Sequence, residues 1–427
     1  MARSIPLVQR RAPPDTAWRW SWLLAAPHRL CFFAAALMLG ASALWWAAVM
    51  AARVQGWAWP WAVAPALAHG LWMGYGFMPL FFAGFLFTAG PRWLAMATPR
   101  AAALRGPVVG LLGGWAAFAA GAHLHALLAA AGLGAAALGW SALVLRFALL
   151  LRGSPVEDKT HARIVAWACG GIALSMGAAA LGLALQQALL VRAALQAGLW
   201  TCVAVVYVAV SHRMIPFFTA AALPVLDAWR PMWLLWTLVA ALAFELPFRL
   251  AEPLWGPLPA PLRALQAGVE APVAALLLWL AWRWGLVQSL KVRLLAMLHL
   301  GFLWLGIAFA LNALSHGLMA ASAGEVSLGL APLHALTMGF FGSTMVAMVT
   351  RVTCGHGGRA LVADDFVWRL FWLLQLAVAA RVLAALWPAA ATALLPLAAL
   401  AWCGAMVAWA LRYGRWYGMQ RADGRPG

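Results

Sequence analysis

Residues 334–359 read HALTMGFFGSTMVAMVTRVTCGHGGR, an apolar run that begins with a histidine and ends in a basic, glycine-rich segment. An earlier stretch, residues 69–75, reads HGLWMGY and shares with it the pattern His-x-Leu-x-Met-Gly-aromatic. Apolar runs of about 20 residues are long enough to cross a bilayer as helices. The repeated pattern therefore predicts two matched histidines inside membrane-spanning helices.

The composition of the 427-residue chain is that of a membrane protein. Hydrophobic residues make up 66% of it, charged residues 9%, and the mean hydropathy is +0.87, values outside the range of soluble domains. The net charge of +18 comes from cations between apolar runs, so we expect no nucleic-acid partner. The first apolar run, residues 30–52, is too long for the core of a signal peptide and predicts an uncleaved helix.

The apolar runs between charged or Pro/Gly-rich breaks predict an all-α polytopic membrane protein with twelve transmembrane helices. The predicted spans are 30–52, 67–90, 104–121, 124–150, 163–186, 190–211, 231–249, 264–285, 293–317, 328–350, 366–387 and 390–412. They form one domain, residues 30–412, between a basic tail, residues 1–29, and a C-terminal tail, residues 413–427. A short turn near His123 and His125 must separate the third and fourth spans.

The distribution of Lys and Arg predicts the orientation, because cations are retained in cytoplasmic segments. With the N-terminus inside, the cytoplasmic segments hold all but five of the 29 cations. Those five are Arg53, Arg192, Arg249, Arg263 and Arg381. Both termini are therefore predicted to be cytoplasmic.

His69 lies at the start of the second span and His334 about one and a half turns into the tenth. Both spans run inward from the outer face, so both histidines are expected in the outer half of the bilayer. Neutral imidazoles from two helices can hold a haem iron without burying net charge, and Gly74, Gly76 and Gly339 would let a porphyrin approach, as would Gly342. The alternative is that each histidine forms a hydrogen bond to a neighbouring helix. Since buried ionisable residues in membranes usually have a function, we favour a bis-histidine haem b.

Copper is the second expected metal, because imidazole nitrogens are good copper ligands. The preferred candidates are His299, His316 and His356, which lie on different sides of the membrane and cannot all bind one ion. His123 and His125 form a His-x-His pair in a turn, where both side chains are usually solvated. The loop from Cys354 to Arg359 offers the Cys354 thiol and the His356 imidazole two residues apart, together with backbone N–H groups and Arg359 that could hold an anion. A tight helix end explains its glycines equally well.

Two cations stand near the outer ends of their helices. Arg249 follows Glu245 by four residues, the spacing of a neutralising pair. Arg381 lies within the apolar eleventh span and either extends to the interface or binds a buried anion such as a haem propionate. The sequence contains no phosphate-binding loop, paired catalytic carboxylates, His-Glu-x-x-His or serine elbow, so hydrolytic and nucleotide-driven mechanisms are disfavoured.

Several of these motifs together resemble the NnrS family over nearly the whole chain. They are HALT at residues 334–337, Thr350-Arg351, Gly355-His356-x-Gly-Arg359, MIPFFT at 214–219 and AGFLFTAGPRW at 83–93. The resemblance implies a multi-pass protein of the bacterial inner membrane that contains haem and copper and takes part in the nitric-oxide response and in denitrification. Many relatives have His-Ala-His-Glu-Met where residues 69–73 of this chain read HGLWM. The first histidine is retained, but Leu71 and Trp72 replace the second histidine and the glutamate, so a metal site that uses those two residues is in doubt.

The arrangement is also similar to that of the catalytic subunit of haem–copper oxidases and nitric-oxide reductases. That subunit has twelve helices and holds a haem between histidines of its second and tenth helices, where this chain has His69 and His334. Its copper histidines lie on the sixth and seventh helices, whereas this chain has only His212 there. We therefore do not expect this chain to contain the binuclear haem–copper centre of those enzymes.

Three classes of function remain open from the sequence. The first is a haem protein that acts on nitric oxide by redox chemistry, as an oxidoreductase with a membrane electron donor, or by sequestration. The second is a twelve-helix secondary transporter whose buried histidines relay protons. The third is a structural membrane partner, which would bind neither haem nor a transported substrate.

Overall fold

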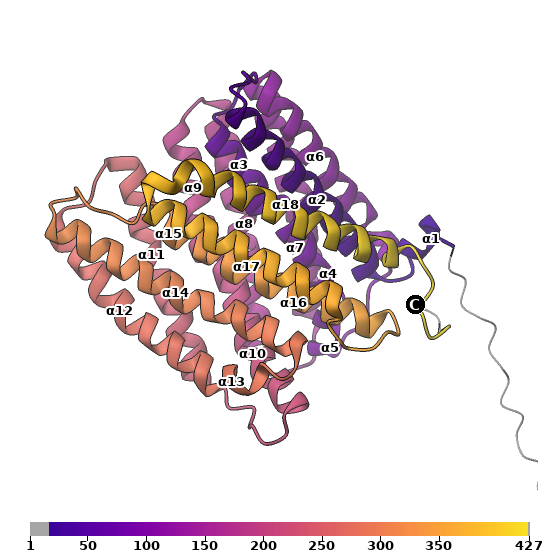
Figure 1. Cartoon of the computed structure of the whole chain (residues 1–427). Helices are drawn as coiled ribbons and strands as arrows, with labels where there is room; N and C mark the ends of the chain where they lie inside the picture. Colours follow the sequence, from indigo (N-terminus) through magenta and orange to yellow (C-terminus); the bar gives the residue numbers. More distant parts are fainter. Residues whose placement is uncertain (1–16, 426–427) are drawn as a thin grey trace, which may run out of the picture.

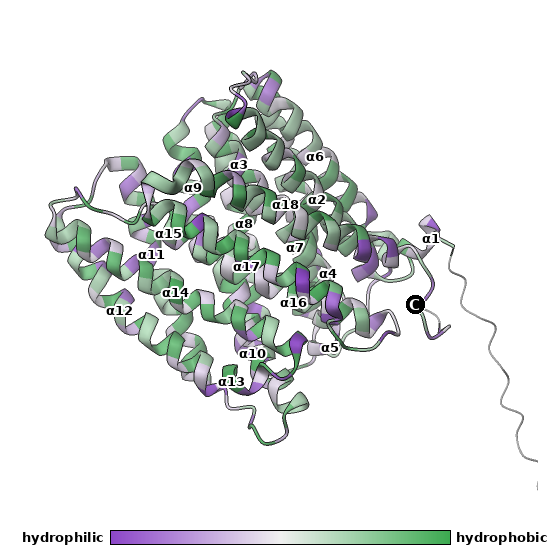
Figure 2. Ribbon diagram, viewed as in Figure 1, coloured by the Kyte–Doolittle hydropathy of each residue, from purple (hydrophilic) through white to green (hydrophobic). Residues whose placement is uncertain are grey.

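A computed structural model describes residues 17–425, and this part of the chain is 80% helical and contains no strand. Eleven of its helical segments are long and apolar enough to cross a membrane. They form one bundle (Figure 1), whose ribbon is mainly hydrophobic along the helices (Figure 2). The predicted all-α polytopic membrane fold is thereby confirmed, while the count of twelve crossings stays a prediction.

The first half of the chain forms the helices α1 to α10 and two short helical segments that are not α-helices, η1 and η2. Their bounds are α1 Trp20–Leu23, α2 Pro27–Val54, α3 Pro65–Tyr75, α4 Met78–Leu86, α5 Ala89–Trp93, η1 Ala101–Leu104, α6 Arg105–Leu124, α7 Ala126–Gly153, α8 Thr160–Ala184, α9 Ala188–Gly198, η2 Leu199–Val203 and α10 Ala204–Ala222. Helix α6 packs against α7, and α7 packs against α8.

The second half continues the bundle and closes it onto the first helix. Its elements are α11 Met232–Trp255, α12 Ala260–Arg283, α13 Leu286–Ser289, α14 Arg293–Ala321, α15 Ala331–His334, η3 Ala335–Gly342, α16 Ser343–His356, α17 Asp365–Leu386, η4 Pro388–Ala390 and α18 Ala391–Tyr417. Helix α12 packs against α14, α17 packs against α18, and α18 packs against α2.

The predicted second span, residues 67–90, is broken into α3, α4 and α5. Pro79 stands in the first turn of α4, and a proline there cannot donate the backbone hydrogen bond that would continue α3 through Gly76. The sixth and tenth spans are not broken but contain the π-helical segments η2 and η3. Three spans that lie four apart in the chain therefore each depart from the regular α-helix.

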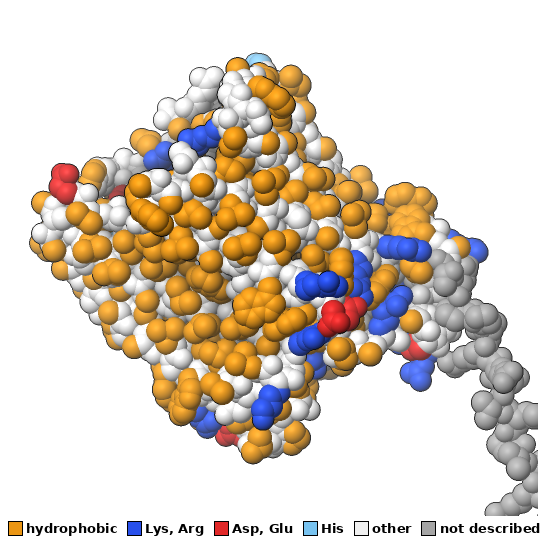
Figure 3. Space-filling view, viewed as in Figure 1, with side chains coloured by type: hydrophobic (Ala, Val, Ile, Leu, Met, Phe, Trp, Pro, Cys, Tyr) orange, Lys and Arg blue, Asp and Glu red, His pale blue; other side chains and the backbone are white. Residues whose placement is uncertain are grey.

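The two described ends of the chain meet at one end of the bundle, which we call the terminal face; the other end is the opposite face. The Arg29 guanidinium donates to the Met419 carbonyl oxygen over 2.7 Å, and the Arg19 backbone N–H donates to the Gly418 carbonyl over 2.8 Å. Figure 3 shows cationic side chains near the same end and a mostly hydrophobic surface elsewhere. Which side of the membrane the terminal face meets stays a prediction.

Some predicted boundaries differ from the observed ones. Helix α2 begins at Pro27, before residue 30, because a proline in the first turn is compatible with a helix. Helix α18 continues to Tyr417, past residue 412, so the predicted C-terminal tail is partly helical. Residues 1–16 of the predicted N-terminal tail lie outside the described residues. The predicted turn between the third and fourth spans is confirmed, since only His125 separates α6 from α7.

Candidate functional site

The two matched histidines lie near the opposite face, where the helices that carry them begin. His69 is on α3, and His334 is the last residue of α15, directly before the π-helical segment η3. The side chain of His334 is buried, with 9% exposure, and interacts electrostatically with His69. The structure therefore places in the same region of the bundle two residues that are far apart in the sequence.

Each of the two imidazoles has a ring nitrogen that is not used in a protein hydrogen bond. His334 Nδ1 lies 2.9 Å from the Leu330 carbonyl oxygen, so Nδ1 donates and Nε2 is the unprotonated nitrogen of the neutral ring. His69 stacks on the Trp46 indole with ring centroids 3.8 Å apart, and its Nδ1 is buried without a partner among the described residues. An unprotonated nitrogen whose ring is fixed by a hydrogen bond to the other nitrogen is a typical metal ligand.

Arg381 of α17 lies beside these histidines and interacts electrostatically with both. Its side chain is partly buried and forms no hydrogen bond or ion pair with any residue in 17–425. A cation inside a membrane is normally paired with an anion. The charge and position of Arg381 therefore suit the propionate of a haem held by the two histidines.

The glycines of the two motifs lie against protein side chains. A Cβ atom on Gly76 would meet the Trp72 ring at 2.4 Å, and one on Gly339 would meet Trp304 at 2.6 Å. Gly74 and Gly342 likewise face the side chains of Leu199 and Trp402. These glycines make room for those side chains, and the expectation that they also admit a porphyrin stays a prediction.

Leu71 and Trp72, where the resemblance implies a histidine and a glutamate, belong to the packed interior. Leu71 is fully buried, and Trp72 lies on Trp45 with ring centroids 5.1 Å apart. Apolar side chains at both positions leave His69 without an imidazole or a carboxylate neighbour from its own motif. His334, which interacts electrostatically with His69, belongs to α15.

The three copper candidates lie in separate places. His299 Nε2 is 2.9 Å from Thr219 Oγ1, His316 Nδ1 is 2.7 Å from Glu270 Oε2, and the His356 ring is 4.6 Å from that of His28. His299 and His316 are 17 residues apart on α14, a rise of about 25 Å. Among the described residues, no three His, Cys, Asp or Glu side chains form a group that could hold a metal ion.

The pair at the tip between α6 and α7 has structural partners. His123 accepts a hydrogen bond from Trp45 Nε1 over 2.9 Å and donates through Nδ1 to the Pro60 carbonyl oxygen, also over 2.9 Å. His125 Nδ1 accepts from the Leu127 backbone N–H and so caps the N-terminus of α7. Both ring nitrogens of His123 are thus engaged, which accounts for this residue without a metal.

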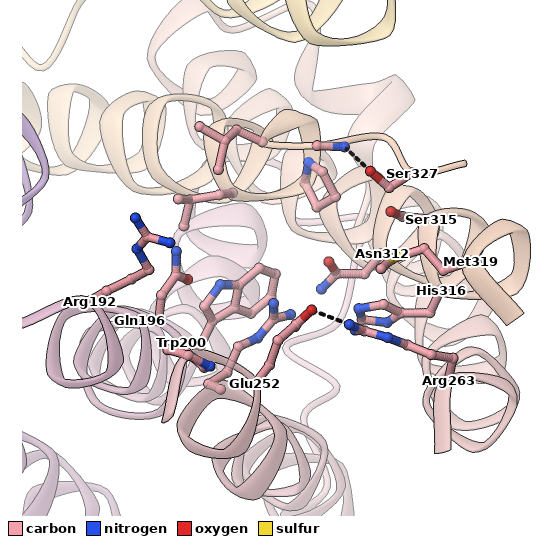
Figure 4. Close-up of a pocket in the computed structure, with 16 residues that line it drawn as sticks. Arg192, Gln196, Trp200, Glu252, Arg263, Asn312, Ser315, His316, Met319 and Ser327 are labelled. Carbon is pink, nitrogen blue, oxygen red and sulfur yellow. Dashed lines mark hydrogen bonds and ion pairs between the residues drawn. The ribbon is translucent and has the colours of Figure 1, made fainter. Parts of the chain in front are cut away.

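A cavity of about 310 Å³ opens beside the start of α15 (Figure 4). Arg192, Arg263 and Glu252 line it, and Arg263 and Glu252 form an ion pair. Leu330 and Leu333 also line it, so the cavity adjoins the turn that carries His334. The cavity therefore lies next to the turn that carries His334, without His69 or His334 among its lining residues.

Two fully buried carboxyl groups lie next to this cavity. Glu245 accepts from Arg249 over 2.7 Å, which confirms the predicted ion pair, and Glu270 contacts His316. The two carboxyl groups also interact with each other. Glu270 was not among the predicted site residues, although an acidic residue in the middle of the apolar stretch 264–285 is itself a signal of a functional position.

A second cavity, at the terminal face, holds a further histidine that the sequence analysis did not select. His28 is 5% exposed and contacts His356 across the boundary between α2 and α16. The glycine-rich loop after α16 closes here: Gly358 has a φ of +67°, and the Arg359 N–H donates to the Cys354 carbonyl over 2.9 Å. The loop is thus a helix end with a left-handed glycine, while its histidine faces a cavity.

Comparison with known proteins supports the resemblance stated from the motifs. The family model described as "NnrS protein" matches residues 22–421 of the chain. The matched range contains every motif on which the resemblance rests and both candidate haem ligands. No curated protein matches the chain.

Proposed function

Because the chain belongs to the NnrS family and is a membrane protein of the nitric-oxide response, we propose that it binds one haem b between His69 and His334 and acts on nitric oxide there. The observation that carries this proposal is the meeting of the two matched histidines, each with an unused ring nitrogen, beside the unpaired Arg381. When bound, a haem supplies an iron centre for one-electron transfer and for binding diatomic gases. Family membership does not favour the transporter alternative.

The residues around the histidines have distinct roles in this proposal. The Leu330 carbonyl fixes the tautomer and orientation of His334, and the Trp46 indole supports the ring of His69. Arg381 neutralises a propionate. The cavity at Arg192 and Arg263 adjoins the turn that carries His334, and nitric oxide, being small and uncharged, can arrive through the bilayer.

A copper ion remains a second cofactor of this proposal, with His299, His316 and His356 as candidate ligands. The nearby Arg92 and Arg421 act electrostatically on His356 and disfavour a cation there. If the protein is an enzyme, it is an oxidoreductase acting on nitric oxide that takes electrons from a membrane donor. As a bacterial protein of this class, it would reside in the inner membrane.

The visible spectrum of the purified protein tests the haem proposal. After expression with added haem precursor, we expect a Soret band and sharp reduced α and β bands. His69→Ala and His334→Ala should each abolish the low-spin spectrum or lose the haem, because an axial histidine fixes both the iron and the porphyrin plane. His125→Ala, which alters an exposed histidine at the same end of the bundle, is the matched control and should retain the spectrum.

A colourless preparation without iron, or an unchanged low-spin spectrum in the His334→Ala protein, would rule out this haem. Metal analysis of His299→Ala, His316→Ala and His356→Ala tests the copper proposal. Full copper content in all three variants would refute these residues as ligands. Nitric-oxide consumption with a defined electron donor then separates redox chemistry from sequestration. Turnover requires the donor, whereas sequestration saturates at one equivalent of gas per haem without it.

A further inference from the structure

The cavity at the terminal face is large and strongly cationic. Its volume is about 640 Å³, and it lies between the start of α2, the segment from Thr98 to Ala102 and the end of α16. Arg92, Arg100 and Arg421 line it together with His28 and His356. No Asp or Glu in the described part of the chain is among its lining residues.

The positive charge of this cavity is only partly compensated. Arg421 donates to Asp423 through two hydrogen bonds of 2.9 and 2.7 Å, which lower the pKa of the Asp423 carboxyl. Arg92 and Arg100, in contrast, form no ion pair with any residue in 17–425. Two guanidinium groups thus face the cavity without a counter-charge from the described protein, the arrangement with which arginines bind phosphate groups.

Buried polar atoms at the cavity also lack partners. His28 Nδ1 and Thr88 Oγ1 are both buried without a hydrogen-bond partner among the described residues. The side chain of His28 is 5% exposed and that of Thr88 is 9% exposed. Both groups line the cavity and are not used in hydrogen bonds within the described protein, so they are available to a ligand that binds there.

The backbone at the start of α2 also contributes positive electrostatic potential to this cavity. Ala26 and Pro27 line the cavity at the N-terminus of the 28-residue helix α2. Pro27 has no backbone N–H, and the Arg29 N–H already donates to the Ala26 carbonyl over 3.1 Å, so this helix end contributes through the helix dipole, which places partial positive charge there. The side-chain charges, the buried donors and the helix end therefore all favour an anion.

We infer that this cavity is a binding site for a phosphate-bearing anion, held by Arg92 and Arg100 with hydrogen bonds from Thr88 and His28. Its volume exceeds what a single phosphate needs, since a water-sized molecule occupies roughly 30 Å³. The ligand is accordingly a phosphate ester or a diphosphate, either from solution or as the headgroup of an anionic lipid. This site is independent of the proposed haem and lies at the other end of the bundle.

The first test is titration of inorganic pyrophosphate into the full-length, haem-loaded protein in phosphatidylcholine nanodiscs, followed by calorimetry. Arg92→Gln should weaken binding about tenfold, because it removes a charge-assisted contact, and Thr88→Val should weaken it several-fold. Arg152→Gln alters an exposed arginine of α7 outside the cavity and should leave affinity within about twofold. Thermal unfolding of each variant, compared with the wild type, shows that it has folded.

The second test distinguishes the two sources of the phosphate. In nanodiscs with phosphatidylglycerol, a headgroup ligand would compete with pyrophosphate, and mass spectrometry should find that lipid retained by the wild type and lost from Arg92→Gln. If pyrophosphate affinity is the same with and without phosphatidylglycerol, the ligand comes from solution. If neither probe binds, or if Arg92→Gln and Arg152→Gln behave alike, the site does not exist.

Discussion

Arg381 is the residue whose environment is least explained by the protein alone. It stands in the apolar helix α17, acts electrostatically on both matched histidines and forms no ion pair within residues 17–425. A cation beside a haem stabilises the reduced form relative to the oxidised form, which carries one more positive charge. If Arg381 holds a propionate, its charge sets the reduction potential of the iron without binding the iron.

Arg381→Gln should therefore lower the haem reduction potential while leaving the bis-histidine spectrum in place. A shift on the order of 60 mV corresponds to a tenfold change for a one-electron couple, and redox titration of the Soret band measures it. Arg53→Gln removes an exposed cation at the same end of the bundle and should change the potential little. Equal potentials in wild type and Arg381→Gln would contradict the propionate contact.

Glu245, unlike Arg381, is a buried charged residue whose ion-pair partner is another residue of the protein. Its carboxyl group is fully buried and accepts from Arg249, whose guanidinium lies 4.3 Å from the centroid of the Trp200 ring. Glu245→Ala would leave that guanidinium without its nearest anion, and loss of one partner of a buried ion pair costs about 3–5 kcal/mol. We expect a clearly lower midpoint of thermal unfolding.

The matched control for this substitution is Glu157→Ala, which removes an exposed carboxylate in the loop before α8. Surface changes of this kind usually alter stability by no more than about 0.5 kcal/mol. Thermal unfolding of both variants in the same detergent compares them directly. Similar midpoints for the two would mean that the Glu245–Arg249 pair does not contribute to stability.

At the scale of elements, the close packing of α6 against α7 depends on small residues. A Cβ atom on Gly132 would lie 2.4 Å from the Phe118 backbone nitrogen, whereas one on Gly134, two residues along the same helix, would meet nothing within 4 Å. Helices in membranes associate through such close backbone contacts, because lipid offers no hydrophobic driving force.

Gly132→Ala should therefore destabilise the protein by about 1–3 kcal/mol, the usual cost of overpacking. Gly134→Ala makes the same chemical change and should be neutral or slightly stabilising, since alanine is the better helix former. Thermal unfolding of the pair measures the difference. Equal stabilities would show that α6 and α7 can separate at little cost.

Most helices could be predicted from the sequence, because apolar length is sufficient to identify a membrane-spanning helix. The break at Pro79 was also visible as a proline signal, although the second span was predicted as continuous. The π-helical segments η2 and η3 could not be predicted, since one extra residue per turn leaves no distinct pattern of hydrophobicity. The roles of Gly76 and Gly339 likewise depended on Trp72 and Trp304, whose positions only the fold reveals.

At the scale of the whole molecule, the sites arise from contacts between distant segments. The pairing of His69 with His334 followed from a shared motif and a predicted common depth, so sequence reasoning could propose it. The contact of His28 with His356 had no such signal, because only the packing of the first helix near the end of α16 creates it. The proposed haem and anion sites thereby occupy opposite ends of one bundle.

The orientation of that bundle decides which compartment each site meets, and the cation distribution makes it testable. All but five of the 29 Lys and Arg residues lie in segments predicted to be cytoplasmic, and such a bias sets topology during insertion. A fluorescent protein at the C-terminus should therefore fluoresce, while alkaline phosphatase at the same position should be inactive. Alkaline phosphatase fused after Glu325, in the loop between α14 and α15, should be active.

A phosphatase fusion after Asp227, between α10 and α11, is the internal control and should be inactive. This loop follows an even number of predicted spans, as the C-terminus does, whereas the loop at Glu325 follows an odd number. The reversed pattern of activities would place the terminal face outside. The proposed anion site would then meet the periplasm and could not bind a cytoplasmic phosphate ester, so the fusions test the setting of that site as well as the fold.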